Sequence, residues 1–533
     1  MPGAREWHEQ CKIASDGPCD CETRGMDSTT TRLHPPVSAA PVEPGATVAR
    51  NAFYLVVGQA ATTALAIVFS AALGRSLGAK DFGVYYLMTT MSTFAYVFVE
   101  WGQPLFVIRE AARAPVRSGE LLGTALALRV AFAIVVTLPA GLISWALGYG
   151  ARTTWLSVLL ILAALPLFLA QGYGMVFRAH DQMGRDAAVS VSNKVIVLVL
   201  TLPALAYGAG IPAVILAQAL AGLAALAVAG QLYRQLGAAP LRFSSAAARE
   251  LLAVGAPILA MTAAVSVQPY LDVIILSKLA PAQVVGWFGA AKNVLGTLIA
   301  PAAILGAAAY PRLARVSADA AALRLQVRAA FRPMLWLGAL GGTGTFLFGS
   351  TAIALIYGER GFGPAASILQ VFAPGLFLLF VDILLGNIIY AAGGGTGFAA
   401  AKVVSVVVGT ALDFVLIPLF QQRYGNGGIG VMVAFALSEF VVFAGAMLVL
   451  RRGTLDPATA ADVVRALGAS AATVALFRVL PPLPPWVGIP LCVIAFAAVS
   501  LALGLVAVRD LAVLRALVRR PGVPTLQVGG SEP

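Results

Sequence analysis

The sequence has few charged residues, few histidines and few cysteines for its length. Only 11% of its 533 residues are charged, whereas soluble proteins carry about a quarter. Three histidines and four cysteines provide no zinc motif or disulfide framework. Cys11, Cys19 and Cys21 lie in a polar N-terminal stretch, and Cys492 lies in an apolar one. We therefore expect no metal site and no cofactor.

Enzyme and nucleic-acid signatures are also missing. The chain has no nucleotide-binding P-loop, no His-Glu-x-x-His sequence and no recognisable nucleophile constellation, and we expect a protein that is not an enzyme. Its net charge of +12 comes from basic residues scattered between apolar runs, so it forms no basic face and predicts no nucleic-acid partner.

Long apolar runs dominate what remains, because 59% of the residues are hydrophobic. Runs of about 18 or more mostly apolar residues are long enough to cross a bilayer as helices. The pattern predicts an all-α polytopic membrane protein with about fourteen transmembrane helices. Their limits are 51–73, 83–107, 121–148, 154–176, 188–208, 210–232, 251–277, 284–308, 331–356, 364–390, 396–420, 427–450, 459–480 and 486–508.

The distribution of lysine and arginine predicts the orientation. With both termini in the cytoplasm, the inside segments and the adjoining ends of the spans hold 26 of the 36 Lys and Arg residues, and the outside turns and their adjoining span ends hold seven. This excess is what the positive-inside rule requires. We expect a multi-pass protein of the cytoplasmic (inner) membrane with both termini cytoplasmic.

Two short stretches indicate an internal repeat. The turn Leu77-Gly78-Ala79-Lys80-Asp81-Phe82-Gly83-Val84-Tyr85 follows the first span, and Leu279-Ala280-Pro281-Ala282-Gln283-Val284-Val285-Gly286-Trp287-Phe288 follows the seventh. Both have a glycine two residues before an aromatic residue. Phe177-Arg178-Ala179 likewise matches Tyr390-Ala391-Ala392, 213 positions later. We interpret these pairs as a duplicated helical unit.

Charged residues inside the spans are the candidate site residues, because a charge at the centre of a membrane helix is disfavoured by roughly 3 kcal/mol. Lys402 and Asp413 share a helix face, and Asp272 is expected to pair with Lys292 at similar depth. The cations suit a diphosphate or acidic sugar. The carboxylates suit sugar hydroxyls, a driving proton or sodium ion, or contacts between helices. The seven candidates are Arg129, Asp272, Lys292, Asp382, Lys402, Asp413 and Glu439.

The first turn resembles that of the polysaccharide and oligosaccharide flippases of the multidrug/oligosaccharidyl-lipid/polysaccharide exporter superfamily. Further matches are Leu271–Leu276, Gly286–Ala291, Tyr310–Arg315 and Asp413–Leu419. The resemblance implies two six-helix lobes around a central hydrophilic cavity that opens alternately to each side, with a glycan on a polyprenyl diphosphate as cargo. Lipid II flippases carry arginines early in the first lobe. This chain has no cation between Asn51 and Leu73, which argues against that subgroup.

The expected organisation therefore has five parts. They are a disordered cytoplasmic tail (1–47), a first lobe (48–240), a second lobe (241–453), two additional transmembrane helices (454–508) and a basic cytoplasmic tail (509–533). The expected function is translocation of a lipid-linked oligosaccharide for cell-surface polysaccharide synthesis. Expected partners are that substrate, membrane lipids, a coupling ion, and a polysaccharide polymerase or glycosyltransferases. The alternatives are a proton- or sodium-coupled small-molecule antiporter and, less favoured, a membrane glycan polymerase or glycosyltransferase.

Overall fold

The computed structural model describes residues 44–358, 361–450, 453–481 and 483–506, and the regular structure in these ranges is helical, with no strand among them. Both predicted tails lie largely or wholly outside these ranges, as do Cys11, Cys19 and Cys21. The helices are α1 (Pro44–Glu100), α2 (Gln103–Arg113), α3 (Ser118–Ala146), α4 (Gly150–Ala179), α5 (Met183–Ala206), α6 (Ile211–Gln235), α7 (Ser245–Ser266), α8 (Gln268–Leu279), α9 (Ala282–Val316), α10 (Ala320–Tyr357), α11 (Gly363–Ala391), α12 (Gly395–Tyr424), α13 (Gly427–Val449), α14 (Pro457–Val479) and α15 (Pro485–Ala502).

Helix α1 is two helices joined at a kink. Its 57 residues are interrupted at Gly78, whose φ of 73° and ψ of 169° are not helical and are accessible to glycine because it has no Cβ. This is the predicted first turn. Thirteen helices among the described residues are long and apolar enough to cross a membrane, and counting both parts of α1 gives the fourteen predicted. The protein is thus a multi-pass membrane protein.

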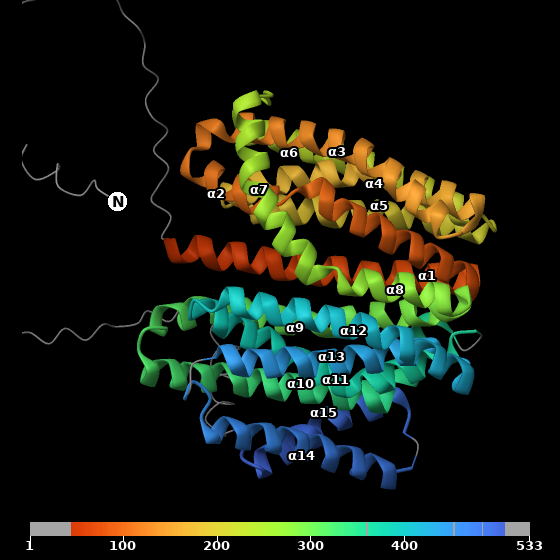
Figure 1. The fold of residues 1–533 in the computed structure, drawn as a ribbon, viewed down its shortest axis with the longest axis vertical. Coiled ribbons are helices and arrows are strands. Elements are labelled where there is room, and N and C mark those ends of the chain that lie inside the picture. The colour runs from red at the N-terminus through yellow and green to blue at the C-terminus, as the bar shows by residue number, and fades with distance from the viewer. Residues whose placement is uncertain (1–43, 359–360, 451–452, 482, 507–533) are drawn as a thin grey trace, which may run out of the picture. The chain divides into compact units, whose positions relative to one another are not determined.

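The predicted span 251–277 is broken into α7 and α8. Pro269 stands at the start of α8, where its missing N–H leaves the preceding turn without a hydrogen bond. Helix α7 packs against α2 and α3 and also against α12, and α8 packs against α9, α12 and α13. In Figure 1, α7 runs obliquely from the group of helices around α2 and α6 to α8 beside α1.

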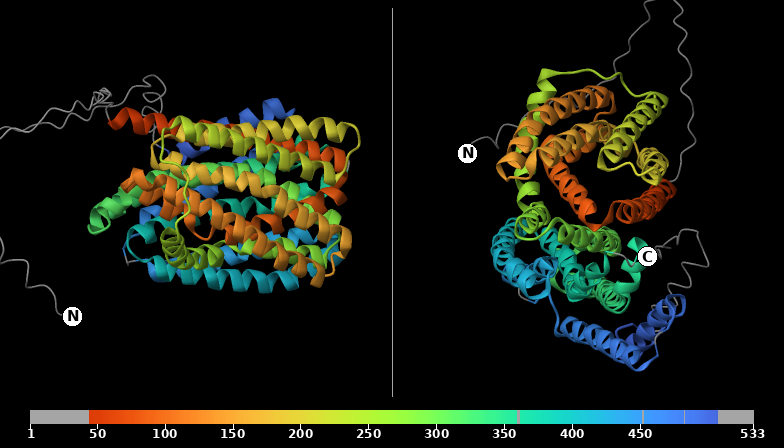
Figure 2. Two further views of the ribbon diagram at one scale, coloured as in Figure 1. Left: turned by 90° about the horizontal axis from the view of Figure 1, so that it is seen from above. Right: turned by 90° about the vertical axis from the view of Figure 1, so that its right-hand side faces the viewer.

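The helix contacts repeat between the two halves of the chain. In the first half, α3 packs on α4, α4 on α6, and α5 on α6. In the second, α10 packs on α11, α11 on α13, and α12 on α13, so the same order of neighbours recurs seven helices later. Figure 2 shows the two groups of helices end on, with α1 and α8 between them. This recurrence agrees with the duplicated unit inferred from the sequence.

The last two helices are attached to the second group through an ionic cluster. Helix α14 packs on α10 and α15, and α15 also packs on α10. Asp462 on α14 is buried with 1% of its side chain exposed, and it accepts hydrogen bonds from Arg332 at 2.9 Å, Arg328 at 3.4 Å and Arg465 at 2.7 Å. Arg328 and Arg332 belong to α10, so these bonds join the two elements.

Candidate functional site

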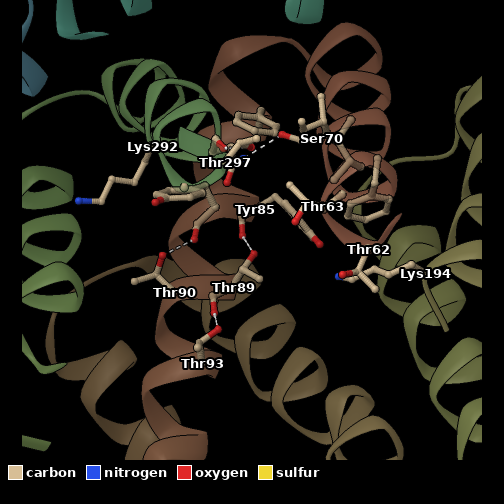
Figure 3. A pocket seen from close by; sticks show the side chains of 18 of the residues that line it. Thr62, Thr63, Ser70, Tyr85, Thr89, Thr90, Thr93, Lys194, Lys292 and Thr297 are labelled. Atoms are coloured by element: carbon tan, nitrogen blue, oxygen red, sulfur yellow. Dashed lines mark hydrogen bonds between the residues drawn. The ribbon is translucent and has the colours of Figure 1, made fainter. Parts of the chain in front are cut away.

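A cavity of about 570 Å³, lined by many polar side chains, lies among helices α1, α5, α8 and α9 (Figure 3). Most of its lining comes from α1, on both sides of the kink at Gly78. Its polar lining residues are Gln59, Thr62, Thr63, Ser70, Tyr85, Tyr86, Thr89, Thr90, Thr93, Lys194, Tyr270, Lys292, Asn293 and Thr297. Because α1 and α5 come from one half of the chain and α8 and α9 from the other, a ligand here contacts both.

The threonines on α1 present hydrogen-bond acceptors to the cavity. The hydroxyls of Thr89, Thr90 and Thr93 donate to the carbonyl oxygens four residues earlier, at 2.5, 2.8 and 2.8 Å. A hydroxyl that donates to its own helix keeps lone pairs free to accept from a ligand. This row of side chains therefore suits a ligand rich in O–H or N–H groups.

Two lysines line the cavity from opposite halves of the chain. Lys194 belongs to α5 and Lys292 to α9, and Figure 3 shows them on either side of the α1 threonines. Neither forms an ion pair within the described residues. The Lys292 ammonium instead lies 5.2 Å from the ring centroid of Phe435 and 5.8 Å from that of Phe288. A cation without an ion-pair partner at the wall of a cavity inside a membrane protein is suited to an anionic ligand.

Five of the predicted charged residues gather around Lys292 in the second half. Asp272 on α8 and Asp413 on α12 are 2% and 1% exposed, and their carboxyl groups are within hydrogen-bonding reach of each other. Lys402 on α12 lies 2.6 Å from Asp382 on α11 and 3.9 Å from Glu439 on α13. We call Asp272, Asp382, Lys402, Asp413 and Glu439 the carboxylate cluster.

The predicted contact between Asp272 and Lys292 is wrong. No ion pair joins them within the described residues, and the carboxyl group within hydrogen-bonding reach of Asp272 is that of Asp413 on α12. Lys292 still attracts Asp272, Asp413 and Glu439 across the space between the helices. Sequence spacing predicts a similar depth for Asp272 and Lys292 but could not show that α12 lies against α8.

Neutral polar groups continue the cluster between the same helices. Gln268 on α8 donates to the hydroxyl of Ser438 at 3.1 Å, and the Ser405 hydroxyl donates to the backbone carbonyl of Ser438 at 2.9 Å. All three residues are buried. These bonds tie α8, α12 and α13 together beside the carboxylates.

Arg129 lies elsewhere, in the interior of the first half. Its side chain is 1% exposed and does not line the cavity of Figure 3. The guanidinium donates to Gln103 at 3.2 Å and to the backbone carbonyl of Phe168 at 2.5 Å, and lies 3.8 Å from Glu100. In this arrangement Arg129 holds α1, α2, α3 and α4 together.

Sequence reasoning missed Lys194 and the α1 threonines. Lys194 falls within the predicted span 188–208, so the cost of an intramembrane charge that singled out the other seven also applied to it. Thr89 and Thr93 are four residues apart and form a polar helix face that helical periodicity could have found. Of the seven predicted residues, Lys292 alone lines this cavity. No group of His, Cys, Asp and Glu suited to a metal ion occurs in the described part of the chain.

At one end of the bundle the two halves are in direct contact. Arg75 donates to the backbone carbonyls of Leu355 and Ile356 at 2.5 and 2.9 Å, and Tyr149 shares a hydrogen bond of 2.6 Å with Ser277. The two repeated turns meet here. A Cβ on Gly83 would lie 1.9 Å from the Ala282 carbonyl oxygen, and one on Gly286 would lie 2.0 Å from that of Ala79. Only glycine permits so close a backbone approach.

Comparison with solved structures identifies the fold. The lipid II flippase MurJ, in an inward closed conformation, superposes with a TM-score of 0.65 at 11% identity, over 87% of this chain and 99% of MurJ. An inward-facing multidrug resistance MATE transporter of the MOP superfamily gives 0.62 at 14% identity, over 74% and 94%. A MOP superfamily transporter from Pyrococcus furiosus, described as having a binding pocket of reverse polarity, gives 0.53 at 14% identity, over 76% and 95%.

Sequence comparison identifies the family. No curated protein matches the chain. The profile of the family described as "Polysaccharide biosynthesis protein" matches residues 48–317, slightly more than half of the chain. That match includes α1 from residue 48 onwards, both repeated turns and all the residues that line the cavity. The protein therefore belongs to the polysaccharide biosynthesis protein family and has the fold of the MurJ and MATE transporters.

Proposed function

We propose that this protein is a flippase that carries a glycan linked to a polyprenyl diphosphate from the inner to the outer leaflet of the cytoplasmic membrane. The observation that carries the proposal is the cavity with two lysines that have no ion-pair partner among the described residues. A diphosphate bears two or three negative charges and needs cations along any path through a medium of low dielectric constant. Lys194 and Lys292 supply one cation from each half of the chain.

The rest of the lining suits the sugar. The α1 threonines accept hydrogen bonds from sugar hydroxyls, and Gln59 and Asn293 offer amide donors and acceptors. A volume of about 570 Å³ is in the range of pockets that enclose drug-sized ligands. We infer that the cavity holds the diphosphate and the first sugars, while the polyprenyl chain stays among the membrane lipids.

The proposed transport cycle is alternating access. With both termini in the cytoplasm, the outer end of the bundle is the one where Arg75 contacts α10 and the two repeated turns meet. The structure is then a state closed to the outside. Separation of the two halves at this end, with closure at the other, would expose the same cavity to the outer leaflet. A polysaccharide polymerase or glycosyltransferases would use the translocated product.

A cation-coupled small-molecule antiporter is the second candidate. The carboxylate cluster favours it, because one oxygen each of Asp382, Asp413 and Glu439 is buried without a hydrogen-bond partner among the described residues, and such oxygens could bind a proton or sodium ion. The shared fold with MATE transporters is compatible with this function. The enzyme alternative, a membrane polymerase or glycosyltransferase, has no comparable support.

Translocation into proteoliposomes tests the proposal. A polyprenyl-diphosphate-linked oligosaccharide with a fluorescent sugar is placed in the outer leaflet of the vesicles. Substrate that crosses to the inner leaflet becomes protected from a membrane-impermeant quencher outside, and the protected fraction of the fluorescence is followed over time. We expect wild-type protein to accelerate this protection, and Lys194→Met and Lys292→Met to slow it at least tenfold. Lys80→Met removes the same charge at an exposed turn outside the cavity and should be unchanged.

Two results would reject the flippase. The first is translocation by wild-type protein no faster than in empty vesicles, and the second is equal rates for Lys194→Met, Lys292→Met and Lys80→Met. A strain that lacks the gene separates the two candidates. Loss of a flippase accumulates lipid-linked oligosaccharide on the cytoplasmic leaflet, whereas loss of an antiporter changes drug resistance without that accumulation.

A further inference from the structure

Lys292 lies at the boundary between the cavity and the carboxylate cluster. Its side chain contributes to the cavity lining, but its ammonium extends away from the α1 threonines (Figure 3). Lys194, on the opposite side of the same cavity, has no carboxylate of the described residues among the charges that act on it. Lys292 is therefore attracted by carboxylates outside the cavity, whereas Lys194 is attracted by none among the described residues.

Carboxylates from three helices attract the Lys292 ammonium. They are Asp272 on α8, Asp413 on α12 and Glu439 on α13. None is in contact with it, and the ammonium lies between the rings of Phe288 and Phe435 at 5.8 and 5.2 Å. A cation attracted by several charges but bound to none can change partner without breaking a short ion pair.

The cluster has more carboxylates than cations. Its four carboxyl groups face two lysines, and Lys402 is held by Asp382 at 2.6 Å and by Glu439 at 3.9 Å. Among the described residues, Lys292 is thus the cation left for Asp272 and Asp413. One oxygen of Asp413 also lacks a hydrogen-bond partner there. Any movement of Lys292 towards the cavity leaves this pair of buried carboxyl groups uncompensated.

We propose that Lys292 is shared between the cavity and the carboxylate cluster, and that it links occupation of the cavity to the charge balance of the second half. The inference rests on the proposed function, because it requires an anionic group in the cavity. When the anion binds, the lysine turns to it and leaves Asp272 and Asp413. Because such coupling is reciprocal, neutralising these carboxylates must strengthen anion binding. Lys292 is a positioning residue in this role, in addition to its contact with the ligand.

A double-mutant cycle measures this coupling. Geranyl diphosphate serves as the probe, and its binding to the purified full-length protein in nanodiscs is followed by calorimetry. We expect Asp272→Asn to tighten binding about fivefold and Lys292→Met to weaken it about tenfold. In the double variant, Asp272→Asn should no longer tighten binding, because its effect acts through the lysine. Lys292→Arg keeps the charge and should keep the effect of Asp272→Asn.

Lys194→Met is the matched control. It should also weaken binding about tenfold, but Asp272→Asn should still tighten binding in its presence, since Lys194 has no link to the cluster. Asp413→Asn provides a second neutralising variant if Asp272→Asn does not fold, and its expected effect is the same. Thermal unfolding of each variant shows that the binding changes are not losses of folded protein.

The outcomes separate this inference from the proposed function. If wild-type protein binds the probe and both lysine variants weaken binding, but Asp272→Asn acts equally with and without Lys292, the coupling is refuted and the flippase stands. If wild-type protein does not bind the probe, both are refuted. Loss of the Asp272→Asn effect in Lys292→Met but not in Lys194→Met supports the coupling.

Discussion

At the level of single residues, polar groups inside the bundle divide into those that hold helices together and those that face the cavity. Arg129 and the α1 threonines represent the two kinds. Arg129 is enclosed by Gln103, Phe168 and Glu100, whereas Thr89 and Thr93 donate to their own helix and face open space. The two kinds should respond differently to substitution.

Arg129→Gln should lower the stability of the folded protein more than it lowers the affinity of the cavity for its ligand. Removing the guanidinium leaves the Phe168 carbonyl and Gln103 without their buried donor, which costs about 3 kcal/mol. Thermal unfolding in detergent measures the change, with Lys80→Met as an exposed control. An unchanged unfolding temperature would show that Arg129 is not a structural residue.

Thr89→Val combined with Thr93→Val should weaken transport without affecting stability. Valine has nearly the same shape, and each hydroxyl bonds only to its own helix, so the fold loses little while the cavity loses two acceptors. We expect translocation of the lipid-linked oligosaccharide to slow about fivefold at low substrate concentration. Thr137→Val is the control, since Thr137 makes the same bond to Ala133 but lies outside the cavity. Equal effects of the two changes would remove the threonines from the site.

Sequence reasoning identified the residues whose charge is unfavourable inside a membrane, but it could not show which of these residues contact one another. The burial of Asp272, Asp413 and Glu439 follows from charges placed within apolar spans. The contact of Asp272 with Asp413, rather than with Lys292, depends on α12 lying against α8. Hydropathy says nothing about which helices are neighbours. Lys194 could have been identified from the sequence, because it is also a charged residue within a predicted span.

At the level of helices, several boundaries were predictable where glycine interrupts an apolar run, but the break at Gly102, which separates α1 from α2 inside the predicted span 83–107, was not predicted. The breaks at Gly208-Ala209-Gly210 and Gly393-Gly394-Gly395 separate α5 from α6 and α11 from α12, as predicted. The break between α7 and α8 was not predicted, because Ser266, Gln268 and Pro269 lie within a run that is otherwise apolar and long enough to span a membrane. Proline is tolerated in membrane helices, so its presence alone does not locate a break.

Attachment of α14 to α10 should depend on Asp462. Asp462→Ala leaves Arg328, Arg332 and Arg465 close together without their shared acceptor, and we expect a loss of about 2 kcal/mol in stability because the arginines are partly exposed. Limited proteolysis between α13 and α14 should become faster. Asp456→Ala, which removes only the N-terminal cap of α14, should have the smaller effect. A reversed order would contradict the ionic attachment.

For the whole molecule, the close approach of the two repeated turns should control closure at that end. Gly286→Val places a side chain where the Ala79 carbonyl lies 2.0 Å from an ideal Cβ, so the closed arrangement is disfavoured. Spin labels on Arg152→Cys and Leu355→Cys should report a longer distance across this end. Gly230→Ala is the control, because a Cβ there meets nothing within 4 Å. An unchanged distance distribution in Gly286→Val would show that the contact does not set the closed state.

The meeting of Gly83 and Gly286 has a consequence for motion. Main chains touch there, and Phe82 packs beside them against Tyr357 and Phe362 of the other half, so opening this end must part the glycine contact and the aromatic contact together. Each copy of the duplicated unit contributes one of the two glycines, so the same turn forms both sides of the closed end. Gene duplication would then have supplied both sides of this closure together with the second wall of the cavity.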